Sequence, residues 1–221
     1  MNTEPQVINL GFVNAFLLPA GDGYVLIDTG MDSQWDLLEK ELLKAGCLPD
    51  KLKLVVITHG DMDHIGNCAR LQKKYGAKIA IHPGDRAMAE TGVPQKRKLK
   101  SFRMKIFITL DRLTRKREPF ETFKPDLRLA DGQDLRDYGL SGKVIHIPGH
   151  TKGSIAILTE AGGLFAGDTV FNRTKPEASP FIQDDQELRD SLAKLKGLNA
   201  RTVYPGHGKP FPFTALAEIE V

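Results

Sequence analysis

Residues 55–67 read VVITHGDMDHIGN, and this stretch decides how the rest of the sequence is interpreted. An apolar, β-rich run leads into two imidazoles and two carboxylates within six consecutive residues, His59 to His64. Side chains at i, i+2, i+4 and i+5 share neither one face of a helix nor one face of a strand. The spacing is typical of a loop that leaves a buried strand and wraps its side chains around a centre. The stretch therefore predicts a metal-binding loop at the end of a strand.

Three later segments have the same character, because each combines a strand-like run, a glycine turn and a ligand-type residue. They are PGH ending at His150, AGD ending at Asp168 and PGH ending at His207. Each glycine permits the positive φ or the close backbone approach that such a turn requires. A single histidine after a glycine is usually a turn residue bonded to backbone. Here four of the six histidines and three aspartates occupy such turns, which favours a two-metal site with one bridging carboxylate.

The rest of the chain predicts strands and helices in alternation. Two apolar runs, 7–20 and 23–30, are joined by the turn signal AGDG and predict a β-hairpin. Ser33 is the expected N-cap of the first helix and Gly46 its C-cap. Helices are predicted at 33–46, 67–76 and 184–198, and strands at 53–58, 77–82, 143–150, 154–163, 164–170 and 201–208. Two sheets covered by helices on the outside would accommodate this order, with functional residues at the ends of strands.

These motifs resemble those of metallo-β-lactamase-fold hydrolases over nearly the whole chain. THGDMDHIGN resembles the opening T-H-x-H-x-D-H-x-G motif, and PGHTKGS, LFAGDTVF and YPGHG resemble the motifs that follow. The resemblance implies an α/β fold, a four-layer αββα sandwich of two mixed β-sheets flanked by helices, with the metals at one edge. We expect a single domain over residues 1–221, with a basic helical insertion at about 85–125.

The resemblance also implies a role for each ligand-type residue. The first metal would be held by His59, Asp61 and His150, and the second by Asp63, His64 and His207, with Asp168 between the two ions and Asp28 supporting the site from behind the ligands.

Asp61 departs from the family pattern, which usually has histidine at this position. Three aspartates and a bridging hydroxide would leave a site with two divalent ions near neutral, whereas a third imidazole would leave it positive. A carboxylate also hardens the first metal site. We therefore expect two divalent metal ions, zinc first, with iron or manganese compatible because of Asp61.

The implied function is a hydrolase in which a metal-bridged hydroxide attacks an ester, thioester or lactone. Asp63 is the expected catalytic residue, because it binds one ion and can orient the hydroxide. The core motifs resemble glyoxalase II-type thioester hydrolases, although the chain ends soon after PGHG, without the C-terminal helical domain of those enzymes. The alternatives are a phosphodiester hydrolase and a non-catalytic metal- or ligand-binding protein on the same fold.

Two further residues are candidates for the substrate pocket. Phe171 stands where the related lactonases carry a tyrosine, three residues beyond the bridging aspartate. His82 lies at the end of a predicted strand and is a candidate for the pocket rim. His146 alternates within a strand, so we expect a structural role for it.

The composition and the N-terminal residues bear on where in the cell the protein is expected. Apolar runs are short and broken by charges, so no transmembrane span is predicted. The N-terminus lacks a basic region followed by an apolar stretch, and two cysteines are too few for a disulfide framework. A cytoplasmic protein with a small-molecule substrate is the simplest interpretation.

The charge is concentrated in one segment. Residues 96–117 contain ten Lys and Arg against one acid, a charge of +9, so the remainder carries −6 because the whole chain carries +3. Apolar residues at helical spacing predict a lid helix with a solvated basic face. The functional alternatives are a pocket wall, a homodimer contact and a contact with an anionic membrane. Few aromatic residues suited to base stacking argue against nucleic acid.

Overall fold

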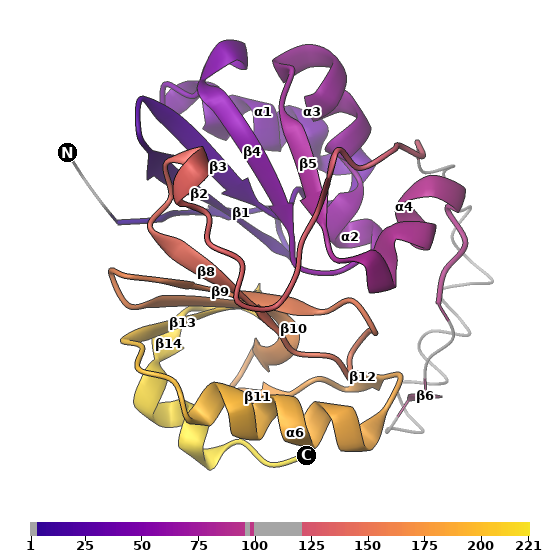
Figure 1. The fold of residues 1–221 in the computed structure, drawn as a ribbon, viewed down its shortest axis with the longest axis vertical. Helices are drawn as coiled ribbons and strands as arrows, with labels where there is room; N and C mark the ends of the chain where they lie inside the picture. The colour runs from indigo at the N-terminus through magenta and orange to yellow at the C-terminus, as the bar shows by residue number, and fades with distance from the viewer. Residues whose placement is uncertain (1–3, 96–97, 100–120) are drawn as a thin grey trace.

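A computed structural model gives the structure of residues 4–95, 98–99 and 121–221 (Figure 1). The first sheet combines an antiparallel meander with parallel strands, in the order β1-β2-β3-β4-β5-β7. These strands are β1 (Gln6–Asn9), β2 (Asn14–Ala20), β3 (Gly23–Ile27), β4 (Leu52–Ile57), β5 (Lys78–Ile81) and β7 (Leu127–Arg128). β2 and β3 form the predicted hairpin, and β3, β4, β5 and β7 pair in parallel.

The second sheet is also mixed and has the order β14-β13-β10-β9-β8. Its strands are β8 (Gly142–His146), β9 (Ile155–Thr159), β10 (Gly163–Asn172), β13 (Thr202–Gly208) and β14 (Phe211–Pro212), with β11 (Pro176–Ala178) paired to β10. β10 and β13 are parallel, whereas β9 is antiparallel to both β8 and β10. A separate two-stranded ladder joins β12 (Phe181–Ile182) to β6 (Lys98–Leu99).

The helices cover the outer faces of the two sheets. They are α1 (Trp35–Lys44), α2 (Met62–Ile65), α3 (Cys68–Tyr75), α4 (Arg86–Thr91) and α6 (Asp185–Lys196). Figure 1 shows α1 and α3 beyond the first sheet and α6 beyond the second. The N-cap of α1 is Gln34 rather than the predicted Ser33, because a 3₁₀ turn precedes the helix and the Gln34 side chain accepts the Met31 N–H.

Alternation along the strands creates three layers of core. In β4, Val55 and Ile57 pack toward α1 and α3, whereas Leu54 and Val56 pack between the two sheets. In β9, Ile155 and Ile157 face the space between the sheets, and Ala156 faces the side of α6. Side chains of successive strand residues point to opposite faces, so an almost unbroken apolar run is what a strand with both faces buried requires. Three cores between four layers establish the predicted αββα sandwich.

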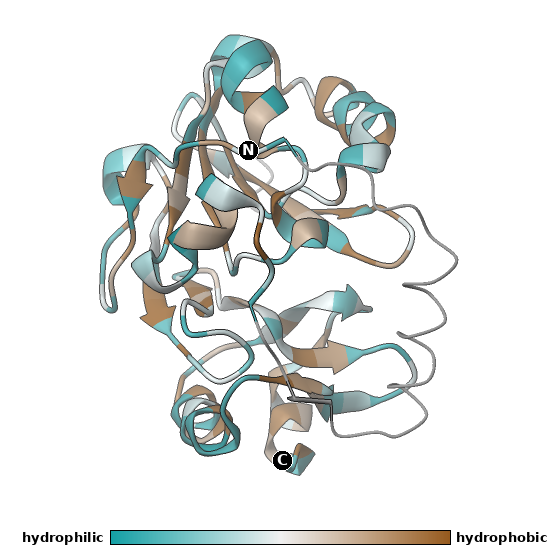
Figure 2. Cartoon of the chain, turned by 90° about the vertical axis from the view of Figure 1, so that its right-hand side faces the viewer, coloured by the Kyte–Doolittle hydropathy of each residue, from teal (hydrophilic) through white to brown (hydrophobic). Residues whose placement is uncertain are grey.

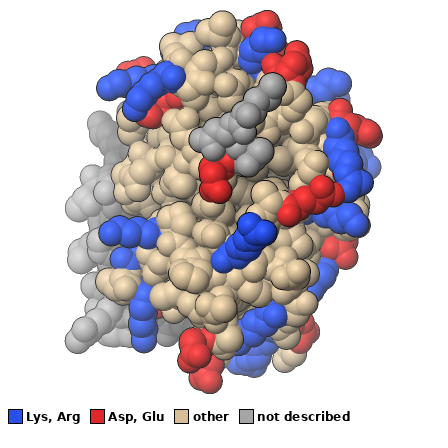
Figure 3. Space-filling view, turned by 90° about the vertical axis from the view of Figure 1, so that its left-hand side faces the viewer, with Lys and Arg blue, Asp and Glu red and all other residues tan. Residues whose placement is uncertain are grey.

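Hydropathy follows the same layering. In Figure 2 the brown, apolar residues gather on the strands, and the helices carry teal residues on their outer sides. Acidic and basic side chains are interspersed on the face drawn in Figure 3. Among the described residues, no helix combines the length and apolarity needed to cross a membrane.

The predicted insertion begins and ends inside the described part of the chain. Met88 and Ala89 of α4 and Phe123 are buried in the core between the first sheet and its helices. The Phe123 N–H donates to the Ala89 carbonyl at 3.0 Å, so the two flanks of the insertion meet. The basic helix predicted over 96–117 lies outside the described residues, apart from the backbone of β6.

The parallel pairing of β3 with β4 positions the start of the site. Because both strands run in the same direction, the residues after their carboxyl ends, Asp28 and Thr58, emerge at one edge of the sheet. The Asp28 carboxylate accepts the backbone N–H of Thr58 at 2.8 Å. Two segments thirty residues apart in the sequence are thereby joined directly in front of the metal-binding loop.

Candidate metal centre

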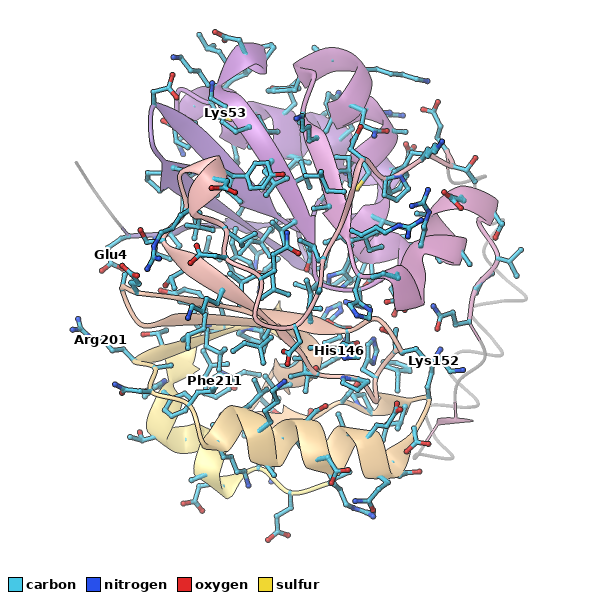
Figure 4. The ribbon with its side chains drawn as sticks, viewed as in Figure 1. Glu4, Lys53, His146, Lys152, Arg201 and Phe211 are labelled. Atoms are coloured by element: carbon cyan, nitrogen blue, oxygen red, sulfur yellow. The ribbon has the colours of Figure 1, made fainter. Side chains whose placement is uncertain are left out.

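The seven ligand-type residues predicted from the sequence meet at one edge of the sandwich. They form two groups in which one donor atom from each residue lies within 4.8 Å of the others: His59, Asp61, His150 and Asp168, and Asp63, His64 and His207. His146 and Lys152, labelled in Figure 4, mark the strand end and the loop on either side of His150. The sequence predicted that these segments converge, although His59 and His207 are 148 positions apart.

Asp61 lies where a third imidazole would be expected. Its Oδ2 is 3.3 Å from Nε2 of His59 and 3.2 Å from Nε2 of His150. Asp61 is the N-cap of α2, and its carbonyl accepts the His64 N–H at 2.8 Å. The shorter carboxylate therefore reaches both imidazoles of its group from the start of a one-turn helix.

The second group is also centred on a carboxylate between two imidazoles. Oδ2 of Asp63 lies 3.3 Å from Nε2 of His207 and 3.9 Å from Nε2 of His64. Asp63 and His64 are neighbours in α2, whereas His207 comes from the end of β13.

Asp168 lies between the groups. Its Oδ1 is 3.2 Å from Nε2 of His64, and its Oδ2 is 3.1 Å from Nε2 of His207. The same Oδ2 lies 3.9 Å from Nε2 of both His59 and His150. The side chain is thus in reach of both groups, as a bridging carboxylate must be.

These separations fit metal coordination. Donor atoms about 2.0–2.2 Å from a tetrahedral ion lie roughly 3.3–3.6 Å from one another. The distances from Asp61 to His59 and His150 and from Asp63 to His207, 3.2–3.3 Å, fall at or close to this range, and the remaining carboxylate–imidazole distances within the groups are 3.9 Å. Imidazole nitrogens and carboxylate oxygens are also the donors that zinc, iron and manganese accept.

Hydrogen bonds fix the orientation of His64 and His59. Nδ1 of His64 donates to Oδ2 of Asp28 at 2.8 Å. The Thr58 hydroxyl donates to the same oxygen at 2.7 Å, so Nδ1 of His59, 3.0 Å from that hydroxyl, must be the donor to it. Both rings therefore carry their proton on Nδ1 and leave Nε2 available as a ligand.

The other two imidazoles are held in the same way by backbone carbonyls. Nδ1 of His150 donates to the Phe181 carbonyl at 2.7 Å, and Ser179 donates to that carbonyl at 3.0 Å. Nδ1 of His207 donates to the Phe12 carbonyl at 2.5 Å. All four histidines consequently direct Nε2 into the shared space.

Several of these inward-facing atoms are buried and lack a hydrogen bond among the described residues. Within the described part of the chain, Nε2 of His59, Nε2 of His64 and Oδ1 of Asp168 have no hydrogen-bond partner. A buried polar atom without a partner costs about 1–3 kcal/mol. Such orphaned donors and acceptors aimed at one point are the signature of a ligand set, and the residues present fit a pair of cations.

The electrostatics of the site favour added positive charge. Burial opposes the charged form of His64, but the carboxylates of Asp168 and Asp28 outweigh it and raise the pKa of the imidazole well above its usual value. Burial also opposes ionisation of Asp168, yet His207 and His64 hold the pKa of that carboxyl well below its ordinary value. The Asp168 carboxylate is thus stabilised by neighbouring imidazolium cations, a role that a metal ion fills more strongly than a proton.

The site opens to solvent on the side of two carboxylates. The side chains of Asp61 and Asp63 are 25% and 24% exposed, whereas His59, His64 and His150 are at most 1% exposed. A substrate would approach from this side.

Backbone strain marks Asp28. Among the described residues it is the one non-glycine residue with positive φ, at 58°. Such a conformation costs an ordinary residue on the order of 1 kcal/mol and persists where the surroundings enforce it. Here it turns the carboxylate back toward Thr58 and His64.

Two glycines of the PGH motifs have the properties predicted for them. Gly149 has a φ of 126° and packs against the backbone of Leu188 in α6. A Cβ on Gly206 would lie 2.3 Å from Oδ1 of Asp168 and 2.7 Å from Cε1 of His64. A side chain at position 149 would therefore collide with α6, and one at position 206 would enter the site.

Asp168 differs from expectation in its local setting. The sequence predicts a strand that ends just after it, but β10 continues to Asn172. The pairing of β10 with β13 shifts register between Gly167 and Phe171, so Asp168 lies at an irregularity within the strand. Such irregularities re-aim a side chain without ending the strand.

Each of the two candidate pocket residues, Phe171 and His82, stacks on a histidine ring. Phe171 is 1% exposed, and its ring stacks on His207 with centroids 4.8 Å apart. His82 stacks on His146 at 4.1 Å, and neither belongs to the ligand groups. Nε2 of His146 is bonded to the Lys152 carbonyl at 2.9 Å, in keeping with the structural role expected of it.

Several residues of the site carry no sequence signal of their own. Thr58 was part of the opening motif, but its contact with His59 depends on the position of Asp28. Ser179 and Phe12 act through a hydroxyl and a carbonyl in loops of no distinctive composition. Asp85, described below, fell at the start of the predicted insertion.

Comparison with known proteins agrees with this geometry. The family model of the metallo-β-lactamase superfamily matches residues 8–207. A β-lactamase-like protein 2 homolog of Caenorhabditis elegans is 26% identical over 93% of this chain and 59% of its own length. A hydroxyacylglutathione hydrolase of Francisella tularensis is 28% identical over 86% of this chain and 60% of its own length. An uncharacterized Mycobacterium leprae protein is 30% identical over 86% of this chain and 82% of its own length.

Solved structures share the fold. A metallo-β-lactamase family protein of Thermus thermophilus superposes with a TM-score of 0.70 and 24% identity, over 97% of this chain and 77% of that chain. The subclass B3 metallo-β-lactamase BJP-1 of Bradyrhizobium japonicum gives a TM-score of 0.69 and 18% identity, over 94% and 76%. At such identities the likeness establishes the architecture alone.

Proposed function

Because this chain belongs to the metallo-β-lactamase superfamily, we propose that it is a two-metal hydrolase of an acyl ester, thioester or lactone. The observation that best supports the proposal is the orientation of the four imidazole rings. Nδ1 of each is held by a protein hydrogen bond, and Nε2 of each faces the carboxylates of Asp61, Asp63 and Asp168. This arrangement has no purpose in a purely structural network, because it leaves buried nitrogens without partners.

The two groups would each hold one divalent ion. His59, Asp61 and His150 are the ligands proposed for the first ion, and Asp63, His64 and His207 those for the second, with Asp168 shared. Two ions bound here supply an activated water nucleophile and polarise the carbonyl of the substrate. Zinc is the expected metal, and the carboxylate of Asp61 makes iron or manganese compatible with the first group.

Asp63 is the proposed catalytic residue. Its carboxylate is partly exposed on the open side of the site, so it can touch both a metal ion and the attacking water. Burial acts to raise its pKa, but His64 and the hydrogen bond from His207 outweigh this effect and lower the pKa below the usual value. The side chain therefore stays ionised at neutral pH and can accept a hydrogen bond that orients the water.

An exposed aromatic side chain beside the ligand groups supports an acyl substrate. Phe12 is 49% exposed, and its ring stacks on His207 with centroids 6.0 Å apart. An apolar side chain next to a metal ligand provides a contact for the non-reacting part of an acyl substrate. The similarity to a hydroxyacylglutathione hydrolase favours a thioester within this class.

Catalysis is favoured over simple metal storage by the open side of the site. A structural metal site is closed by its ligands, whereas a catalytic one keeps a position for water or substrate. The partly exposed Asp61 and Asp63 leave such an approach, and the histidines behind them close the other sides.

The test is hydrolysis by the full chain loaded with Zn(II), measured on a panel of thioesters, lactones, carboxylic esters and phosphodiesters. His59→Ala and His64→Ala, one from each ligand group, serve as controls. We expect turnover of at least one acyl substrate and its loss in both variants. Turnover of phosphodiesters alone would replace the acyl class, and no turnover above the two variants would overturn the proposal.

A further inference from the structure

Asp85 is a buried carboxylate outside both ligand groups, and it accepts four hydrogen bonds. Its Oδ2 accepts the Gly60 N–H at 2.7 Å and the Thr151 hydroxyl at 2.6 Å. Its Oδ1 accepts the Gly153 N–H at 3.0 Å and the side-chain amide of Gln95 at 2.8 Å. All four partners are donors, so the carboxylate form is the one that the surroundings satisfy.

Three of the four partners of Asp85 lie in the two loops that carry the first ligand group. Gly60 stands between His59 and Asp61, and Thr151 directly follows His150. Apart from the shared Asp168, every donor of the first group comes from these loops. By contrast, none of these four hydrogen bonds is with the second group.

Two glycines allow the carboxylate to come this close. A Cβ on Gly153 would lie 2.6 Å from Cγ of Asp85, and a Cβ on Gly60 would lie 3.0 Å from its Cβ. The glycine between the two ligands of the opening motif and the glycine of PGHTKGS are therefore needed for the same contact. Both loops are packed around one side chain.

A second route leads from Asp85 back to the His150 loop. Gln95, which donates to Asp85, accepts a hydrogen bond from the side-chain amide of Gln183. The side-chain oxygen Oε1 of Gln183 in turn accepts the Lys152 N–H at 2.8 Å. The loop at 150–153 is thus held from two sides, by Asp85 and by Gln183.

We propose that Asp85 is a positioning residue that sets the distance between the His59–Asp61 loop and the His150 loop, and thereby the affinity of the first metal ion. This inference rests on the proposed two-metal function. Supporting residues of this kind typically change metal affinity 10- to 100-fold when removed. Because the ligand loops that Asp85 joins are those of the first group, we expect its loss to weaken binding of that ion and to leave the second ion in place.

Asp85→Asn is the sharpest substitution, because it keeps the size of the side chain. An amide has one oxygen and one NH₂ group in place of two acceptors. In either orientation, its NH₂ would face a backbone N–H, that of Gly60 or that of Gly153. Rotation of the amide cannot restore both contacts.

Single-site backgrounds separate the two ions. His207→Ala leaves the first group intact, and His150→Ala leaves the second. Co(II) is titrated into each background with and without Asp85→Asn, and the Kd and the visible absorption spectrum of Co(II) are recorded. We expect Asp85→Asn to weaken binding about 10- to 100-fold in the His207→Ala background and less than about threefold in the His150→Ala background.

Two substitutions of Thr151 distinguish loss of the contact with Asp85 from general unfolding. Thr151→Ser keeps the hydroxyl that reaches Asp85, whereas Thr151→Val removes it at similar size. In the His207→Ala background, Co(II) affinity should fall in the valine variant and persist in the serine variant. Equal weakening in both backgrounds, or none in either, would overturn the positioning role. Failure of the unsubstituted chain to bind two Co(II) ions would instead overturn the proposed function.

Discussion

The Asp28 carboxylate accepts a hydrogen bond from Nδ1 of His64 at 2.8 Å, and neither side chain is exposed to solvent. The bond fixes which ring nitrogen of His64 carries the proton and which faces the other ligands. Asp28 also accepts two hydrogen bonds from Thr58, so one carboxylate orients an imidazole in each ligand group. Its strained backbone shows that the fold maintains this contact at a cost.

The first prediction follows from this contact. Asp28→Asn should weaken binding of Zn(II) about 10- to 100-fold, because His64 loses the acceptor that orients it. Competition with a chromophoric chelator measures the change. Asp22→Asn is the matched control, since the Asp22 carboxylate is 77% exposed and pairs with the surface residues Lys51 and Lys53. Equal affinity in the two variants would contradict the prediction.

The second prediction concerns the metal selected by Asp61. The carboxylate lies between His59 and His150, where it hardens the first group. Protein purified without added metal should therefore contain a larger share of iron or manganese than Asp61→His, which should shift toward zinc. Elemental analysis of both proteins measures the content. The same metal content in the two would argue against Asp61 as a ligand.

The third prediction tests the close packing at Gly206. Gly206→Ala would place a methyl group against Asp168 and His64, so we expect about a 100-fold loss of Zn(II) affinity, at the upper end for residues supporting a metal site. Gly197→Ala at the end of α6 is the control, because its Cβ would meet no atom closer than 3.5 Å. Circular dichroism should show a folded protein in both cases. An unchanged affinity in Gly206→Ala would mean that the site has more room than the structure shows.

The fourth prediction concerns the two cysteines, which are both fully buried. Burial raises the pKa of Cys47 to about 12 and that of Cys68 well above its ordinary value. A thiol-specific reagent at pH 8 should thus react with neither in the native state and with both in guanidinium chloride. Ser33→Cys, at an exposed position, provides a thiol that should react at once. Rapid native reaction of the unsubstituted chain would contradict the burial.

The same shift has a consequence for stability. An unfolded chain ionises its thiols near pH 8.5, whereas the folded chain keeps Cys47 protonated up to about 12. The contribution of this group to stability is complete below pH 8.5 and is lost as the pH rises toward 12. Denaturant titrations between pH 9 and 11 should therefore show a shallower decline in Cys47→Ala than in the unsubstituted chain.

The fifth prediction addresses the basic segment, residues 96–117. Ten cations against one acid should bind vesicles of anionic lipid at low salt and release them at high salt. Flotation with anionic and with zwitterionic vesicles distinguishes charge from apolar insertion. No binding to anionic vesicles at low salt would eliminate a membrane role and leave the pocket wall, the homodimer contact and the lid helix as interpretations.

The convergence of the ligand-type residues could be predicted because the signal of each motif is local. His59 to His64 lie within six residues, and each of the three other turns is announced by a glycine beside the ligand. The layers of the sandwich could be predicted for a related reason. A strand buried on both faces needs an unbroken apolar run, and β4 shows it in LKLVVI.

The supports of the site could not be predicted because their signal is three-dimensional. Phe12 contributes a carbonyl, which every residue possesses, and only the fold brings it to His207. Asp85 looks like a turn residue before a helix, and its meaning depends on loops twenty-five and sixty-six positions away. The glycine before Asp168 indicated a turn at the end of a strand. In the structure β10 continues through this glycine, and its pairing with β13 shifts register there.

The second group joins His64, from the first third of the sequence, to His207 in β13. A ribosome that has released the chain only as far as α6 has therefore made most of both sheets but not His207. The second group is completed when β13 is made, so a truncated translation product that stops before this strand would carry most of the scaffold with an incomplete group.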